Sequence, residues 1–156
     1  MSRVYELAKR FQNKYFGTIA FRLRAHAQVI DDNLSDDEKV LYVFCGQKGY
    51  SHREIFSTCI VALTDKRIIV ATKRVLWGYF LTTITPELFN DLKVQTGIIF
   101  GRVTIDTAKE LLTISNLSKK STTEVQNAFT KYINQYKDKD EKDSDNCQIV
   151  CVNTNK

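Results

Sequence analysis

The side chains of this 156-residue chain best suited to bind a metal or act as nucleophiles are its four cysteines and two histidines. Cys45 and Cys59 lie within apolar stretches, where a free cysteine packs as a small hydrophobic residue. Cys147 and Cys151 are separated by three residues in a polar tail, and neither histidine is near them. A structural zinc site takes four ligands, commonly in closely spaced pairs. The spacing therefore predicts no metal site and no cofactor, and it favours free thiols over disulfides.

Groups that could carry out catalysis are equally scarce. The acidic run at residues 36–38 follows Ser35 and is explained by the capping of a helical turn. Neither His26 nor His52 has a nucleophile or a carboxylate close to it in sequence, although pairing in space stays open. The glycines of segment 97–101 are not followed by the Lys-Ser/Thr pair of a phosphate-binding loop. We therefore expect a protein that is not an enzyme.

The charge of the chain is unevenly distributed. The formal net charge is +5, and residues 1–30 hold six bases and one acid. Residues 31–137 hold 14 bases and 12 acids, and residues 138–156 hold three bases and five acids. A localised basic segment favours phosphates, anionic lipids or an acidic protein partner, but the solvated side of an ordinary helix has the same composition. The apolar stretches are too short to cross a bilayer, so we expect a cytoplasmic protein.

The basic N-terminal segment has the pattern of an amphipathic helix over residues 3–30. Its apolar residues recur at three- and four-residue steps and form one stripe. Gly17 weakens the centre of this helix and predicts either a kink or a split into two helices. The stripe either docks on a membrane or another chain, or packs on the protein's own sheet. The residues assigned to a partner-binding arm are Leu7, Phe11, Tyr15, Ile19 and Leu23.

The middle of the chain has the pattern of a β domain that ends in a helix. Seven short strands at spacings of roughly ten residues are typical of an antiparallel sandwich or barrel. A capping box at residues 121–124 opens a helix with an aromatic stripe over residues 122–136, and this stripe is expected to close one end of the barrel. After Lys137 a charged run predicts a mobile tail. The predicted strands are 40–45, 55–63, 68–72, 79–85, 92–95, 102–105 and 111–114.

This order of elements, seven strands and a C-terminal amphipathic helix, resembles the pleckstrin-homology (PH) superfold. Three segments carry the likeness to small bacterial PH-like domains, in particular the YokE-like branch: LSDDEKV at 34–40, TDKRII at 64–69 and GIIFG at 97–101. The helix at 122–136 completes it, so the resemblance covers about residues 34–137. It implies an α+β fold, a PH-like seven-stranded antiparallel barrel or sandwich with two nearly orthogonal sheets, capped by the C-terminal helix. It does not imply an enzyme.

The resemblance also divides the chain and points to a ligand site. It leaves residues 1–33 as an N-terminal helical arm and residues 138–156 as a flexible charged tail, on either side of a PH-like domain at 34–137. Lipid-binding PH domains of eukaryotes use bases in the loop between the first two strands and in the loop between the third and fourth. The usual basic pattern is incomplete here, because the base at position 53 is followed by Glu54 and is not preceded by a base at position 51. The candidate ligand-binding residues implied are Lys48, Arg53, Lys73, Arg74 and Trp77.

Two functions of different classes remain. The first is a non-enzymatic binding or scaffold module whose arm mediates protein–protein interaction or self-association as a homo-oligomer. The alternative is a peripheral membrane module that binds anionic lipid headgroups with the bases of the arm and the two loops. Nucleic-acid binding is not expected, because it needs exposed aromatic side chains and those of the arm have the spacing of buried residues.

Overall fold

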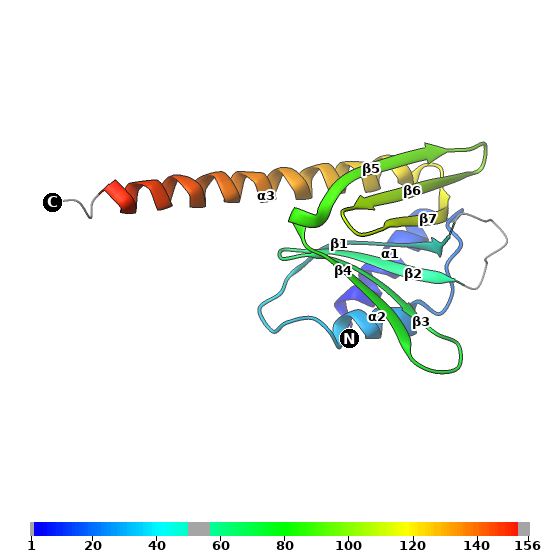
Figure 1. The fold of residues 1–156 in the computed structure, drawn as a ribbon. Coiled ribbons are helices and arrows are strands. Elements are labelled where there is room, and N and C mark those ends of the chain that lie inside the picture. Colours follow the sequence, from blue (N-terminus) through cyan, green and yellow to red (C-terminus); the bar gives the residue numbers. More distant parts are fainter. Residues whose placement is uncertain (1, 50–56, 153–156) are drawn as a thin grey trace.

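The computed structural model describes residues 2–49 and 57–152, of which residues 139–152 are described by their backbone alone. Seven antiparallel strands form one sheet in the order β4-β3-β2-β1-β7-β6-β5 (Figure 1). With the C-terminal helix and the helical N-terminus, this sheet confirms the predicted α+β architecture. The strands are β1 (Val40–Lys48), β2 (Thr58–Thr64), β3 (Ile68–Lys73), β4 (Tyr79–Ile84), β5 (Phe89–Thr96), β6 (Phe100–Thr107) and β7 (Leu111–Ser118), with a 3₁₀ turn at Pro86–Leu88.

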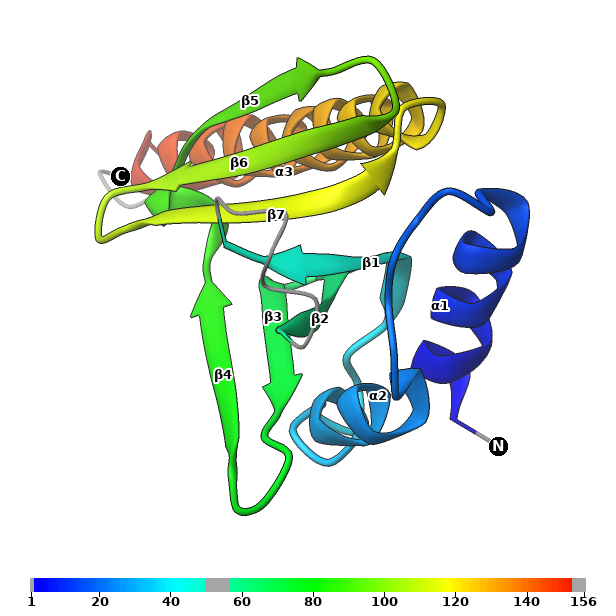
Figure 2. The same cartoon turned by 90° about the vertical axis from the view of Figure 1, so that its right-hand side faces the viewer.

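The sheet curls into a half-barrel because β1 belongs to both of its halves. β1 pairs with β2 over most of its length, but with β7 only at Gln47 and Lys48. The strands of the β1–β4 half therefore cross those of the β5–β7 half steeply (Figure 2). Gly46 lies at this junction, where a Cβ atom would stand 2.6 Å from Ile114 Cγ2 and 2.9 Å from the carbonyl oxygen of Ser115. The close approach of β1 to β7 thus requires glycine at this position.

The N-terminal arm forms two helices rather than one. Helix α1 (Arg3–Lys14) and helix α2 (Leu23–Asp31) are separated by a connection at residues 15–22, which contains Gly17. The split is one of the two outcomes that this glycine predicted. Both helices pack on one face of β1, β2 and β3, and the interior of the half-barrel covers the other face (Figure 2). Strand β2 is consequently buried along its whole length, which explains its continuous apolar sequence.

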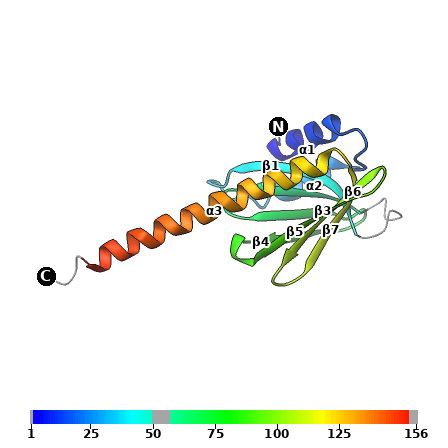
Figure 3. The same cartoon turned by 90° about the horizontal axis from the view of Figure 1, so that it is seen from above.

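Helix α3 (Ser121–Val152) lies across β5, β6 and β7 and closes the half-barrel with its aromatic stripe. Phe129 and Tyr132 are buried, as the sequence predicted. The predicted end of this helix near Tyr136 is wrong, because the helix continues to Val152 and projects beyond the barrel (Figures 1 and 3). Residues 122–152 contain neither glycine nor proline, so the charge of this segment does not by itself end the helix.

The arm is tied to the first turn of α3 by a polar cluster around Glu124. The carboxylate of Glu124 accepts hydrogen bonds from Lys14 Nζ and from the hydroxyl groups of Tyr15 and Tyr42. Burial alone would raise the pKa of Glu124, but these hydrogen bonds hold it below its ordinary value. The cluster joins three elements that are far apart in the sequence, and it fixes α1 against the barrel.

Candidate functional site

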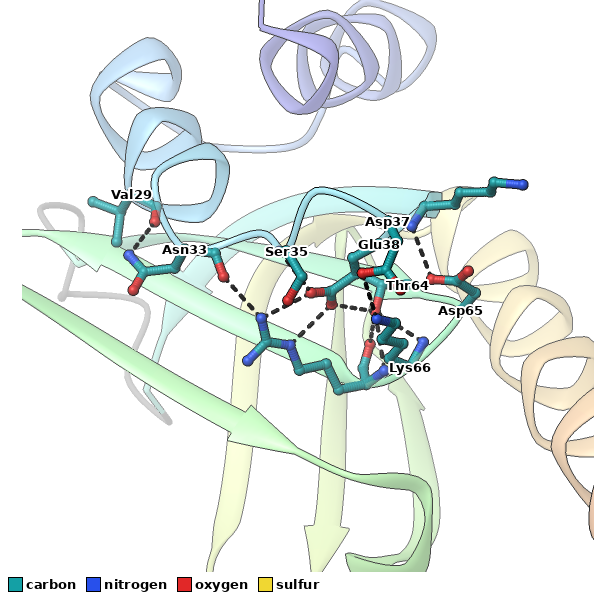
Figure 4. A network of polar contacts seen from close by, with 10 residues as sticks. Val29, Asn33, Ser35, Asp37, Glu38, Thr64, Asp65 and Lys66 are labelled. Carbon is teal, nitrogen blue, oxygen red and sulfur yellow. Dashed lines mark hydrogen bonds and ion pairs between the residues drawn. The ribbon is translucent and has the colours of Figure 1, made fainter.

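The most extensively hydrogen-bonded carboxylate, Glu38, serves the fold rather than a reaction. Its oxygens accept two hydrogen bonds from the guanidinium of Arg67, at 2.9 Å from Nε and 2.8 Å from Nη2, and one from Thr64 Oγ1 at 2.7 Å (Figure 4). The backbone N–H of Ser35 donates to the same carboxylate, as the predicted capping box requires. Burial raises the pKa of Glu38, but the hydrogen bonds from Arg67, Thr64 and Ser35 outweigh it and lower the pKa to about 2.

This network joins two of the sequence segments that carried the resemblance, residues 34–40 and 64–69. The Arg67 guanidinium also donates to the carbonyl oxygen of Asn33 at 2.8 Å, so the chain entering β1 is held on the β2–β3 hairpin (Figure 4). These residues are therefore recognisable in the sequence because the fold needs them. They do not mark a ligand site.

The two cysteines whose side chains are described are inert for a similar reason. Cys45 and Cys59 are free and buried on neighbouring strands, and burial raises the pKa of each thiol to about 12. A thiol with such a pKa is not a nucleophile at neutral pH. In the described part of the chain, no three His, Cys, Asp or Glu residues are grouped so that they could hold a metal ion.

The predicted ligand residues converge in part around the hairpin that links β3 and β4. Lys48 at the end of β1 and Arg74 beyond β3 lie over the same ring, with Nζ 6.0 Å and Cζ 5.1 Å from the centroid of Phe80. Lys73 Nζ lies 5.9 Å from the ring centroid of Tyr79. The structure thus gathers three predicted bases on exposed aromatic rings of β4. Arg53, the fourth predicted base, lies outside the described residues.

The tip of the β3–β4 hairpin exposes apolar side chains to solvent. Leu76 and Trp77 are 84% and 83% exposed, and Val75 is exposed beside them. The turn is closed by a hydrogen bond from Arg74 N–H to the Gly78 carbonyl, at 3.2 Å, and Gly78 adopts a positive φ of 74° that glycine tolerates without strain. Trp77 was predicted as a site residue, whereas Leu76 and Val75 were not. The only sequence signal for them is an apolar stretch inside a connection between strands.

The base of the hairpin is fixed by a buried histidine on α2. Nδ1 of His26 accepts a hydrogen bond from the backbone N–H of Lys73 at 2.7 Å. Burial, with a contribution from the positive charge of Arg22, lowers the pKa of His26 to about 4. The imidazole is therefore neutral at physiological pH and serves as an acceptor, which anchors the hairpin to the arm.

The residues assigned to a partner-binding arm are occupied by contacts within the chain. Phe11 and Leu23 are buried in the core, and Leu7 and Tyr15 pack against it with part of their surface exposed. Ile19 is half-buried, and its backbone N–H donates to the Asn116 carbonyl at 3.0 Å. The arm thus packs on its own barrel, which was one of the alternatives that the sequence left open. In the described part of the chain, no helix is both long enough and apolar enough to cross a membrane.

Comparisons with known proteins place this arrangement in a family. The family described as bacterial PH domain matches residues 34–135. Two solved structures are similar: a DUF1696 family protein with a PH domain from Shewanella loihica PV-4, and a PH domain from Shewanella amazonensis SB2B. The first has 14% identity and a TM-score of 0.44 and covers 69% of this chain and 92% of its own. The second has 15% identity and a TM-score of 0.42 and covers 69% and 81%.

No curated protein matches the sequence, and no enzyme family is indicated by the matches. The finer assignment to the YokE-like branch stays a prediction. The family match spans most of the chain, from the segment before β1 to the part of α3 that covers the barrel. The chain therefore belongs to the bacterial PH domain family.

Proposed function

We propose that this protein is a non-catalytic module that binds anionic membrane surfaces through the β3–β4 hairpin. The observation that carries the proposal is the exposed apolar tip, with Leu76 and Trp77 almost completely in water. Exposed large apolar groups that gather in one place mark an interaction site. Tryptophan is favoured at the membrane–water interface, where its ring lies at the level of the lipid headgroups.

The bases around the tip complement a negatively charged surface. Lys73 and Arg74 directly precede the apolar residues, and Lys48 lies over the ring of Phe80 on the adjoining strand β4. The charged groups of these bases lie over the rings of Tyr79 and Phe80, with Arg74 exposed and Lys48 and Lys73 half-buried. Near an anionic bilayer each base contributes about 1 kcal/mol of attraction. Insertion of a side chain such as Leu76 adds roughly 1.5–3 kcal/mol if its surface is removed from water.

The proposal is tested by the binding of the full chain to vesicles. Because Trp77 is the only tryptophan, its emission should shift to shorter wavelength when phosphatidylglycerol-containing vesicles are added, but not with phosphatidylcholine alone. Replacing Leu76 with serine is expected to weaken partitioning about tenfold or more, from the loss of roughly 1.5 kcal/mol of insertion energy. Binding should also weaken between low and moderate salt, because the charge attraction is screened.

The matched control is Leu111→Ser, which removes an exposed leucine at the start of β7 and should leave binding unchanged. Flotation gives the bound fraction of each variant independently of fluorescence. Absence of binding to anionic vesicles at low salt would overturn the proposal. Equal losses in the two variants would show that the hairpin has no special role.

A second candidate, peptide binding, is supported by a different part of the molecule. Strand β5 is an edge of the sheet, and its outer edge has no strand partner among the described residues. A groove of about 250 Å³ lies between this edge and α3. An extended peptide can add to such an edge while its side chains enter the groove. The groove is lined by the apolar residues Phe89, Leu92, Phe129 and Ile133 and the polar residues Asp91, Gln126, Thr130 and Asn134.

This candidate is again a protein-interaction function, but the binding surface is the groove between β5 and α3 and not the N-terminal arm. A short peptide of alternating lysine and valine is a suitable probe, because Asp91 lies in the groove. Titration should shift the backbone amide resonances of β5 and α3, and Leu92→Arg should abolish the shifts while Leu111→Arg does not. Shifts confined to other strands, or no shifts, would exclude the groove.

A further inference from the structure

Exposed apolar side chains gather at the end of the barrel that carries the β3–β4 hairpin. The connection between α1 and α2 and the turn between β5 and β6 lie at this same end (Figures 1 and 3). Phe16 in the first is 93% exposed, and Ile98 in the second is 94% exposed, with Ile99 exposed beside it. Elsewhere in the described part of the chain, Leu41 and Leu111 are exposed, at the start of β1 and of β7. Both of these positions are at the opposite end.

The charged residues of the connections are also distributed unevenly between the two ends of the barrel. At the hairpin end, the connections 15–22, 74–78 and 119–120 contain bases and no acid, the turn 97–99 is uncharged, and Lys73 ends β3. Taken together, the connections 32–39, 65–67, 85–88 and 108–110 contain seven acids and four bases, although 65–67 by itself has more bases than acids. The bases of the hairpin end are Arg22, Lys73, Arg74, Lys119 and Lys120. Of the acids counted above, Asp32 lines a pocket together with Lys73 and Tyr79 and so lies near the hairpin. The other acids are Asp36, Asp37, Glu38, Asp65, Glu87 and Glu110, and the bases of the same connections are Lys39, Lys66, Arg67 and Lys109.

The α1–α2 connection is hydrogen-bonded to the barrel, and the β5–β6 turn is closed by a hydrogen bond of its own. In the α1–α2 connection, Thr18 Oγ1 accepts a hydrogen bond from Ser118 N–H at 3.0 Å. The N–H of Phe21 donates to Thr58 Oγ1 at 2.9 Å in the same connection. The β5–β6 turn is closed by a bond of 2.8 Å from Gly97 N–H to the Phe100 carbonyl. Each of the two tips is thus carried by a connection whose backbone is hydrogen-bonded.

We infer that this whole end docks on an anionic bilayer at three anchors: the β3–β4 tip, the Ile98–Ile99 turn and Phe16. The inference rests on the proposed membrane function. It adds two connections to the membrane contact, whereas the proposed function needs only the β3–β4 hairpin. Three separate anchors define a plane and so fix the orientation of the domain. The acidic end then faces away from the negative surface, in keeping with charge complementarity. In this orientation α3 points away from the bilayer, because it projects from the opposite end (Figure 1).

The test places a single tryptophan at each anchor and measures its quenching by brominated phosphatidylglycerol vesicles. The proteins are the natural chain with Trp77, Trp77→Phe/Ile99→Trp and Trp77→Phe/Phe16→Trp. The control, Trp77→Phe/Leu111→Trp, carries its reporter at the opposite end. Vesicle concentration is set for each protein so that flotation shows equal bound fractions. The reporters at positions 77, 99 and 16 are expected to be quenched, and the control reporter is expected to stay unquenched.

The outcomes separate the inference from the proposed function. Quenching of Trp77 without quenching at positions 16 and 99 would overturn the three-anchor orientation and leave the hairpin as the membrane contact. Absence of vesicle binding by the natural chain would overturn both. The double variant Ile98→Ser/Ile99→Ser is expected to weaken partitioning about tenfold relative to Leu111→Ser. Unchanged partitioning of that variant would also overturn the inference. So would self-association of the protein, at the concentration of the vesicle assay, that covers the apolar end with a second copy.

Discussion

Replacing Phe129 with alanine is expected to lower the free energy of unfolding by about 3–5 kcal/mol, the usual range for a large-to-small change of a buried aromatic residue. The side chain is only 1% exposed, and its ring centroid lies 6.1 Å from that of Phe44 and 5.9 Å from that of Phe89. The variant therefore loses contacts to both halves of the sheet and leaves a cavity beneath α3. Urea denaturation followed by circular dichroism measures the change.

Asn127→Ala is the matched control, because Asn127 lies exposed on the same helix two residues earlier. Its effect should stay within about 0.5 kcal/mol. If the two variants were destabilised equally, α3 would not close the half-barrel in the way described.

Replacing Glu38 with alanine is expected to destabilise the protein by about 3 kcal/mol, the lower end of the range for breaking a buried ion pair. The Glu38 side chain is inaccessible to solvent, but that of Arg67 is 25% exposed, so water partly compensates the orphaned guanidinium. The exposed pair of Asp37 with Lys66 provides the control, and Asp37→Ala should change the stability by less than about 1 kcal/mol. Equal effects in the two variants would contradict a special role for the buried pair.

The same carboxylate predicts how stability depends on pH. The pKa of Glu38 is about 2 in the folded protein and 4.5 without the fold, so the unfolded chain binds a proton more readily. The stabilisation is present above pH 4.5 and is lost as the pH falls from 4.5 towards 2. Glu38→Ala removes this contribution, so the difference in unfolding free energy between the natural chain and the variant should shrink over that interval. A difference independent of pH would contradict the role assigned to the ionised carboxylate.

The fold was largely predictable because its elements depend on local patterns. The aromatic stripe that includes Phe129 and Tyr132 repeats at helical spacing, and a stripe of that kind must cover an apolar surface. The capping box at residues 35–38 and the strand rhythm are also local. The capping box predicted at residues 121–124 does not form, because the Glu124 carboxylate accepts from Lys14, Tyr15 and Tyr42 and the Ser121 hydroxyl donates to the Ser118 carbonyl. The end of α3 was mispredicted, because a charged composition was taken to exclude ordered helix. The segment after Tyr136 is rich in aspartate, a weak helix former, but it contains no glycine or proline to break the helix.

The candidate site was predictable only in part. The bases Lys48, Lys73 and Arg74 and the ring of Trp77 were proposed as ligand residues from their place in the resembled fold. The arrangement of the three bases over the rings of Phe80 and Tyr79 was not predicted. Leu76, Ile98 and Phe16 were missed altogether, because an apolar residue in a connection is most often buried. Only coordinates show that these side chains point into water and lie at one end.

The element types, the β domain with its closing helix, and the uneven charge of the chain could be read from the sequence, since each follows from composition and from spacing between neighbours. The packing of the arm's apolar stripe, the pairing of Glu38 with Arg67 and the identity of the exposed apolar residues required the folded structure. Burial and charge pairing depend on segments that are distant in sequence. Their proximity is set by the curl of the whole sheet at the junction of β1 and β7.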